Sequence, residues 1–126
     1  MTDIIGQMTA RGRPIIGGGS VGLFGSVLRT EILVILALSG ESYPRELARM
    51  LSASLSATQL AVNMLELTGV IASRLRGKVR LVELNPKHFC RDELYALLLR
   101  LSNGYPHLIE LAGTIRRRPR RAGKPL

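Results

Sequence analysis

The feature of the sequence that most limits the fold is a change of pattern at Gly69. From Ser56 to about Thr68, apolar residues recur every three or four positions, as they do on one face of a helix. Gly69 then supplies a helix stop, because glycine readily adopts the left-handed conformation found at helix C-termini. The inner face of the helix is predicted to consist of Thr58, Val62 and Leu65.

A β-hairpin is predicted directly after this helix. Residues Val70–Leu75 and Lys78–Leu84 contain alternating or β-branched residues, and Gly77 lies between them as the turn residue. Asn85-Pro86 closes the second strand. The chain therefore passes from a helix into two short antiparallel strands without a long connection.

Further helices are predicted on both sides of this unit. Pro44 can open a short helix, because the N–H that proline lacks is unpaired at the first helical position anyway. Either Ser54 or Ser56 can cap the helix that ends before Gly69. The other helical patterns cover residues 23–38, 91–102 and 106–115.

The resulting order is that of a winged helix-turn-helix domain with extra C-terminal helices, which is a mainly α fold with one β-hairpin. The helix before Gly69 is the expected recognition helix, and the hairpin is the wing. A helix fits the DNA major groove, whereas a basic hairpin can lie along the flanking backbone or minor groove. We expect a flexible arm at 1–22, the winged helix-turn-helix at 23–86, C-terminal helices at 87–115 and a basic disordered tail at 116–126.

The charge of the chain favours a polyanionic partner. Eighteen Lys and Arg against nine Asp and Glu give a net charge of +9, with a pI near 11.0. Nucleic acid is the usual partner of such a chain, and an anionic membrane surface is a less frequent one. No secretory signal is apparent, and the most apolar run, Val27–Leu38, is interrupted by Arg29 and Glu31. We expect no membrane span.

Cysteine and histidine are too few to indicate a metal or catalytic site. Cys90 is the only cysteine, which excludes an intramolecular disulfide and fits a reducing cytoplasm. His88, His107 and Cys90 are the only soft ligands, whereas a closed zinc site normally has four. No carboxylate pair or Ser–His–Asp set is evident. We expect neither an enzyme nor a cofactor.

Four segments together resemble the ArsR-type winged-helix regulators, in particular the branch associated with small nucleotidyltransferases. These segments lie between Leu23 and Leu101 and read LFGSVLRTEILVILAL, YPRELARML, SLSATQLAVNMLELTGVIASRLRGKVRLVELNP and DELYALLLRL. The resemblance implies a cytoplasmic, nucleoid-associated homodimer that binds double-stranded DNA, with its dimer contacts in helices outside the helix-turn-helix. In this chain the apolar stripe on such a helix is Leu94, Leu97, Leu98 and Leu101.

The recognition helix offers base-reading amides but no positive charge. Gln59 and Asn63 lie four residues apart and share a face, and either amide can bind adenine N6 and N7. The alternative is that both are solvated polar residues. Where the family usually carries basic residues, this chain has apolar ones, among them Leu60 and Met64. This apolar surface could be covered by a second subunit, by the N-terminal arm or by a protein partner. The predicted base-reading residues are Ser56, Gln59 and Asn63.

Positive charge is concentrated in the wing and the tail. Four basic residues surround Gly77, where they can contact phosphates or protect an edge hairpin against aggregation. The predicted backbone contacts are Arg45, Arg49, Arg74, Arg76, Lys78, Arg80, Arg116, Arg117 and Arg118. The favoured function is a sequence-specific, dimeric transcriptional regulator. The alternative is an architectural or protein-interaction module with only non-specific nucleic-acid binding.

Overall fold

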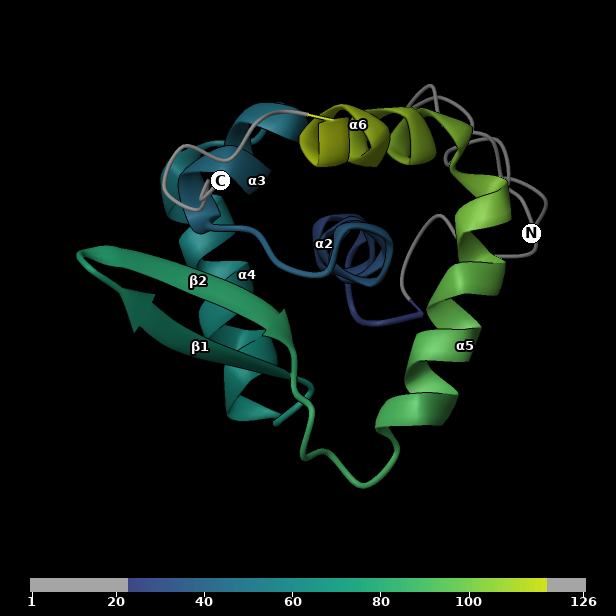
Figure 1. Ribbon diagram of the computed structural model, residues 1–126, viewed down its shortest axis with the longest axis horizontal. Coiled ribbons are helices and arrows are strands. Elements are labelled where there is room, and N and C mark those ends of the chain that lie inside the picture. Colours follow the sequence, from purple (N-terminus) through teal and green to yellow (C-terminus); the bar gives the residue numbers. More distant parts are fainter. Residues whose placement is uncertain (1–22, 118–126) are drawn as a thin grey trace, which may run out of the picture.

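A computed structural model describes residues 23–117. The predicted arm at 1–22 and most of the predicted tail lie outside this range. Six helical elements and one hairpin follow each other in the described part (Figure 1). Their bounds are α2 Val27–Ser39, α3 Pro44–Met50, α4 Leu55–Leu67, β1 Ile71–Arg76, β2 Val79–Leu84, α5 Arg91–Leu101, the 3₁₀ turn η1 Ser102–Gly104 and α6 Pro106–Arg117.

Helix α2 forms the centre of the fold. Every residue from Thr30 to Ala37 is buried, so this helix is covered around its whole circumference. In Figure 1 it is seen nearly end-on, with α4 and the hairpin on one side, α5 on the other and α6 across the top. The predicted helix at 23–38 is therefore confirmed in type, but its helical part begins later, where the Ser26 side chain accepts a hydrogen bond from the Arg29 N–H.

The ends of α4 are set by local interactions. Ser54, not Ser56, is the N-cap, and its hydroxyl accepts a hydrogen bond from the Ala57 N–H at 3.0 Å. Gly69 follows the helix with a φ of +87°, in the region that favours glycine. The chain can turn there into β1 without the steric cost that a Cβ would add.

The hairpin has the register expected for a two-residue turn. Arg76 pairs with Val79, and Gly77 at the first turn position has a φ of +64°. Val82 and Leu84, on one face of β2, belong to the hydrophobic core, and Leu81 on the opposite face is also buried. The hairpin is also joined to the segment before α3, because Ser42 and Val82 exchange both backbone hydrogen bonds.

The leucine stripe of α5 corrects one prediction. Leu98 is fully buried in the core of its own chain, and Leu94 and Leu101 pack against that core. Helix α5 packs against α2, and Leu98 is completely covered by its own chain. Its side chain is therefore not accessible to a second subunit. Of the four predicted dimer residues, only Leu97 is exposed. An apolar stripe identifies a buried face, and here the neighbour that buries it belongs to the same chain.

Helix α6 runs further than predicted. It continues to Arg117, whereas the sequence pattern placed its end at Ile115 and the start of the tail at 116. The backbone of the first two arginines of the predicted tail is therefore helical. Positive residues are compatible with a helix C-terminus, because they interact favourably with the negative end of the helix dipole.

Candidate nucleic-acid interface

The outer face of α4 is exposed and carries no positive charge. Thr58 lies on the inner face, as predicted, where its hydroxyl donates to the Ser54 carbonyl at 2.9 Å. On the outside, Leu60, Met64 and Leu67 form an exposed apolar stripe, and Leu60 is 62% exposed. The three predicted base-reading residues are all exposed on this helix: Ser56, Gln59 and Asn63.

Strand register separates the basic residues of the wing onto two faces. Leu75 is directly opposite Arg80, so these two side chains share one face of the hairpin. Arg74 and Arg76 alternate with Leu75 and therefore lie on the other face. The three strand arginines are close in sequence, but Arg80 lies on the opposite face of the hairpin from Arg74 and Arg76.

Arg74 and Arg76 share a carboxylate on their face of the wing. The Arg74 guanidinium lies 2.7 Å from Glu41 and 3.7 Å from Glu83, and Arg76 lies 3.6 Å from Glu41. Both arginine side chains remain about half exposed. Such pairs are weak because water screens them, so a phosphate can compete for either guanidinium.

Lys78 and the α3 arginines have no such carboxylate. Lys78 is exposed beside Gly77 at the tip of the wing, and Arg45 and Arg49 are exposed on α3. None of these three side chains forms an ion pair within residues 23–117. No ion pair with a carboxylate of residues 23–117 has to be broken before they contact a polyanion.

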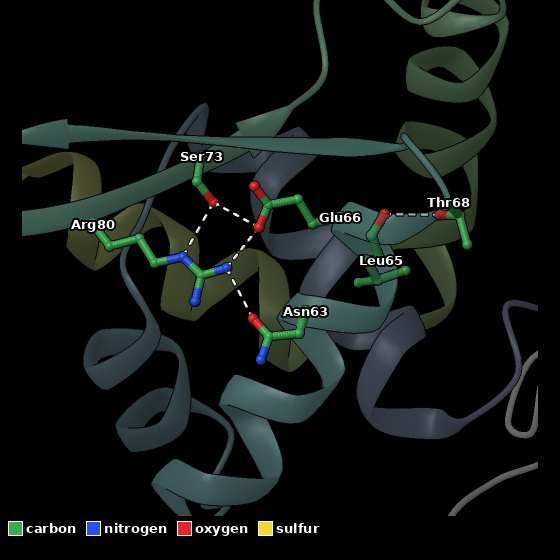
Figure 2. A network of polar contacts seen from close by, with 6 residues as sticks. All are labelled: Asn63, Leu65, Glu66, Thr68, Ser73 and Arg80. Atoms are coloured by element: carbon green, nitrogen blue, oxygen red, sulfur yellow. Dashed lines mark hydrogen bonds and ion pairs between the residues drawn. The ribbon is translucent and has the colours of Figure 1, made fainter.

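Arg80 joins the wing to α4 (Figure 2). Its Nη2 donates to Glu66 Oε1 at 2.6 Å and to Asn63 Oδ1 at 3.0 Å, and its Nε donates to Ser73 Oγ at 3.1 Å. The Ser73 hydroxyl in turn donates to Glu66 Oε1 at 3.0 Å. The guanidinium is thus held by acceptors from both α4 and β1.

This network changes the role assigned to Arg80. The sequence pattern grouped it with the other wing cations as a phosphate contact, whereas its guanidinium is turned towards α4 and neutralised by Glu66. It holds the wing against α4. Glu66, Ser73 and this use of Asn63 were not predicted. The one hint was Glu66, the only charged residue between Ser56 and Gly69.

Three predicted backbone contacts, Arg116, Arg117 and Arg118, have side chains outside the part of the chain that the structure describes. The backbone of Arg116 and Arg117 belongs to α6, whereas the whole of Arg118 lies outside the described part. Within that part, no three His, Cys, Asp or Glu side chains gather as a metal site would require. His88 Nδ1 instead accepts a hydrogen bond from the Cys90 N–H. No helix there has the length and apolar character needed to cross a membrane.

These elements define a winged helix-turn-helix domain: α3 and α4 form the helix-turn-helix, β1 and β2 form the wing, and α2, α5 and α6 complete the core. Neither a protein-family model nor a curated protein matches the sequence. Solved structures match the fold, and they share less than a fifth of their residues with this chain.

Two similar structures are of ZitR from Lactococcus lactis. One is a substituted ZitR with a TM-score of 0.59 and 16% identity, over 90% of this chain and 77% of that one. The other is a ZitR variant in complex with DNA, with a TM-score of 0.57 and 19% identity, over 91% and 87%. The adhesin competence repressor AdcR from Streptococcus pyogenes matches with a TM-score of 0.51 and 13% identity, over 91% and 75%.

Proposed function

We propose that this protein is a sequence-specific, dimeric DNA-binding regulator of transcription. The observation that carries the proposal is the fixed arrangement of an exposed polar helix face beside a basic hairpin, with Arg80 joining the two. A recognition helix needs a defined angle to the backbone contacts that position it. A ZitR variant of the same fold has been solved in complex with DNA, which supports the assignment.

In this proposal the two parts of the interface act differently. Helix α4 enters the major groove with Ser56, Gln59 and Asn63 towards the base edges. The wing supplies phosphate contacts through Arg74, Arg76 and Lys78, and α3 adds Arg45 and Arg49. Arg80 is a positioning residue. The arginines from Arg116 to Arg118 extend the contact with the backbone through their charge.

The proposal includes a homodimer. Exposed apolar side chains on α5 and α6 support it, because a second copy of the chain could cover them. These side chains are Tyr95, Leu97, Leu99 and Ile109. Sedimentation equilibrium tests this point, with Leu97→Lys plus Ile109→Lys expected to yield a monomer and Arg100→Ala as the control.

We assign the protein to the ArsR-type regulators and place it in the cytoplasm with the nucleoid. The motifs from Leu23 to Leu101 support the family, and the charge supports the location. The function is binding and not catalysis, with no cofactor, because none of the proposed contacts involves a reactive group.

A second candidate function is docking of a protein on α4. The stripe of Leu60, Met64 and Leu67 favours it, because large apolar side chains are unusual on a helix that faces a polyanion. Under this alternative, duplex affinity would be weak and independent of sequence.

A selection experiment separates the two functions. A random duplex pool is equilibrated with the full chain at two salt concentrations, and the bound fraction is sequenced. Enrichment of two related half-sites about one helical turn apart supports the regulator. Uniform binding that weakens with salt supports the architectural alternative. A chain that binds no duplex even at low salt would contradict DNA binding altogether.

A further inference from the structure

The amide of Asn63 is not free to present either of its ends to DNA. Its Oδ1 accepts a hydrogen bond from Arg80 Nη2 at 3.0 Å. In Figure 2 the amide nitrogen lies on the side of the group that faces away from Arg80. Asn63 is nevertheless an exposed residue on the outer face of α4.

The chemistry of the partner determines which end of the amide faces Arg80. A guanidinium has five N–H donors and no acceptor, so only the amide oxygen can face it. An amide turned by 180° would place two N–H groups against a cationic donor, which is unfavourable. The Nδ2 group, with its two donors, therefore points outwards.

Arg80 is itself held in place, so the orientation of Asn63 persists. Its Nε donates to Ser73, and its Nη2 also donates to Glu66 at 2.6 Å. Hydrogen bonds between charged groups are shorter and stronger than neutral ones. With Nε and one Nη2 hydrogen held by these two acceptors, the second Nη2 hydrogen is directed at Asn63. Turning the Asn63 amide would break this contact without replacing it.

We propose that Asn63 is a specificity-determining residue that selects a keto base, guanine or thymine, at one position of the binding site. This inference rests on the proposed function. In the major groove, guanine offers the acceptors N7 and O6, and thymine offers O4. Cytosine presents an amino donor that would oppose the Nδ2 donors. Adenine can accept only one hydrogen bond, at N7, and its N6 amino donor then lies beside the Nδ2 donors with no amide oxygen to receive it, so adenine is disfavoured relative to guanine and thymine.

Gln59 provides an internal comparison. It is one helical turn from Asn63 on the same face, and its side chain has no hydrogen bond within residues 23–117. Its amide is free to rotate and can pair with adenine through both ends. Helix α4 thus presents two amides: that of Asn63, whose NH₂ group is held facing outwards, and that of Gln59, which can turn either its oxygen or its NH₂ group outwards.

The test is base preference, measured by competition among duplexes that differ at single positions. The Asn63→Ala variant should lose discrimination at one position by roughly fivefold to tenfold, the lower part of the range for a base contact. Asn63→Asp keeps an acceptor for Arg80 but presents an oxygen outwards. It should therefore change the preference at that position from guanine or thymine to cytosine or adenine. Gln59→Ala is the matched control and should affect a different position.

Arg80→Met tests the cause of the preference. Freed from the guanidinium, the Asn63 amide can rotate, and adenine should become acceptable at the same position. Circular dichroism and thermal unfolding establish that this variant is folded. The Asn63→Asp result stands without it, because that substitution is at an exposed site.

The outcomes distinguish this inference from the proposed function. If the wild-type chain selects a sequence but Asn63→Ala selects the same one, the inference fails and the regulator remains. Adenine or cytosine at the Asn63-dependent position in the wild type also overturns it. A wild-type chain that binds no duplex overturns both.

Discussion

The outer face of α4 and the wing lie side by side, and they differ in almost every property that matters for binding. The α4 face has polar amides, an apolar stripe and no cation, whereas the wing has four cations in seven residues. The wing cations are partly neutralised by Glu41, Glu66 and Glu83. Under the proposed function, the wing would supply binding strength and α4 would select bases, with the charge of the wing partly offset by these carboxylates.

The distribution of charge along the chain supports this separation. Residues 23–115 have ten basic and eight acidic side chains, whereas residues 116–126 have six basic and none acidic. The net charge therefore comes mainly from the end of the sequence. With ten basic and eight acidic side chains, residues 23–115 have little net charge, so their exposed cations would attract a polyanion mainly at short range.

The largest expected effect follows from removing the two arginines on one wing face. Arg74→Ala combined with Arg76→Ala should weaken duplex binding by roughly 30-fold at moderate salt and lower the log–log salt slope by about 1.8, for two lost phosphate contacts. Fluorescence anisotropy titrations at several salt concentrations measure both quantities. Arg100→Ala on α5 is the control. An unchanged slope would remove this wing face from the interface.

The next effect tests whether α4 approaches DNA at all. Leu60→Lys adds a cation at a site that is 62% exposed, so the free energy of unfolding should change by less than about 0.5 kcal/mol. If α4 faces the groove, affinity should rise by roughly fivefold and the salt slope by about 0.9. The same titrations apply, with Leu60→Gln as the neutral control. No change in slope would favour protein docking on this helix.

A smaller effect of opposite sign is expected from Glu41. Its carboxylate is shared by Arg74 and Arg76, so it competes with phosphate for both. Glu41→Gln should tighten duplex binding by about twofold to threefold, comparable to the loss of one weak surface ion pair. Weaker binding would mean that Glu41 is needed to orient the arginines. Asp92→Asn, distant from the wing, is the control for the change in net charge.

The smallest effect on binding is expected at the start of α4. Ser54→Ala removes the hydroxyl that accepts from the Ala57 N–H, which should lower the free energy of unfolding by about 1 kcal/mol. The salt slope should not change, because no charge is involved. Urea denaturation measures the stability, and Ser56→Ala is the comparison without a capping bond. Equal losses in the two variants would contradict the assignment of Ser54 as the cap.

Much of the fold was accessible from sequence because its signals are local. The helix with Thr58, Val62 and Leu65 on its inner face, the stop at Gly69 and the turn at Gly77 depend on spacing and backbone preference. The exposure of Gln59 and Asn63 follows from the same spacing. The dimer role given to Leu98 failed because periodicity identifies a buried face without identifying what covers it.

The sequence by itself therefore determined the order of the elements, the inner and outer faces of α4, and the concentration of charge in the wing and the tail. Only the tertiary structure decided that Arg80 faces α4 while Arg74 and Arg76 face Glu41. Those contacts join residues 14 to 35 positions apart, so they depend on how the hairpin packs against the helices. Short-range spacing contains no information on that packing. The orientation of the Asn63 amide, with its oxygen towards Arg80, therefore became evident only from the tertiary structure.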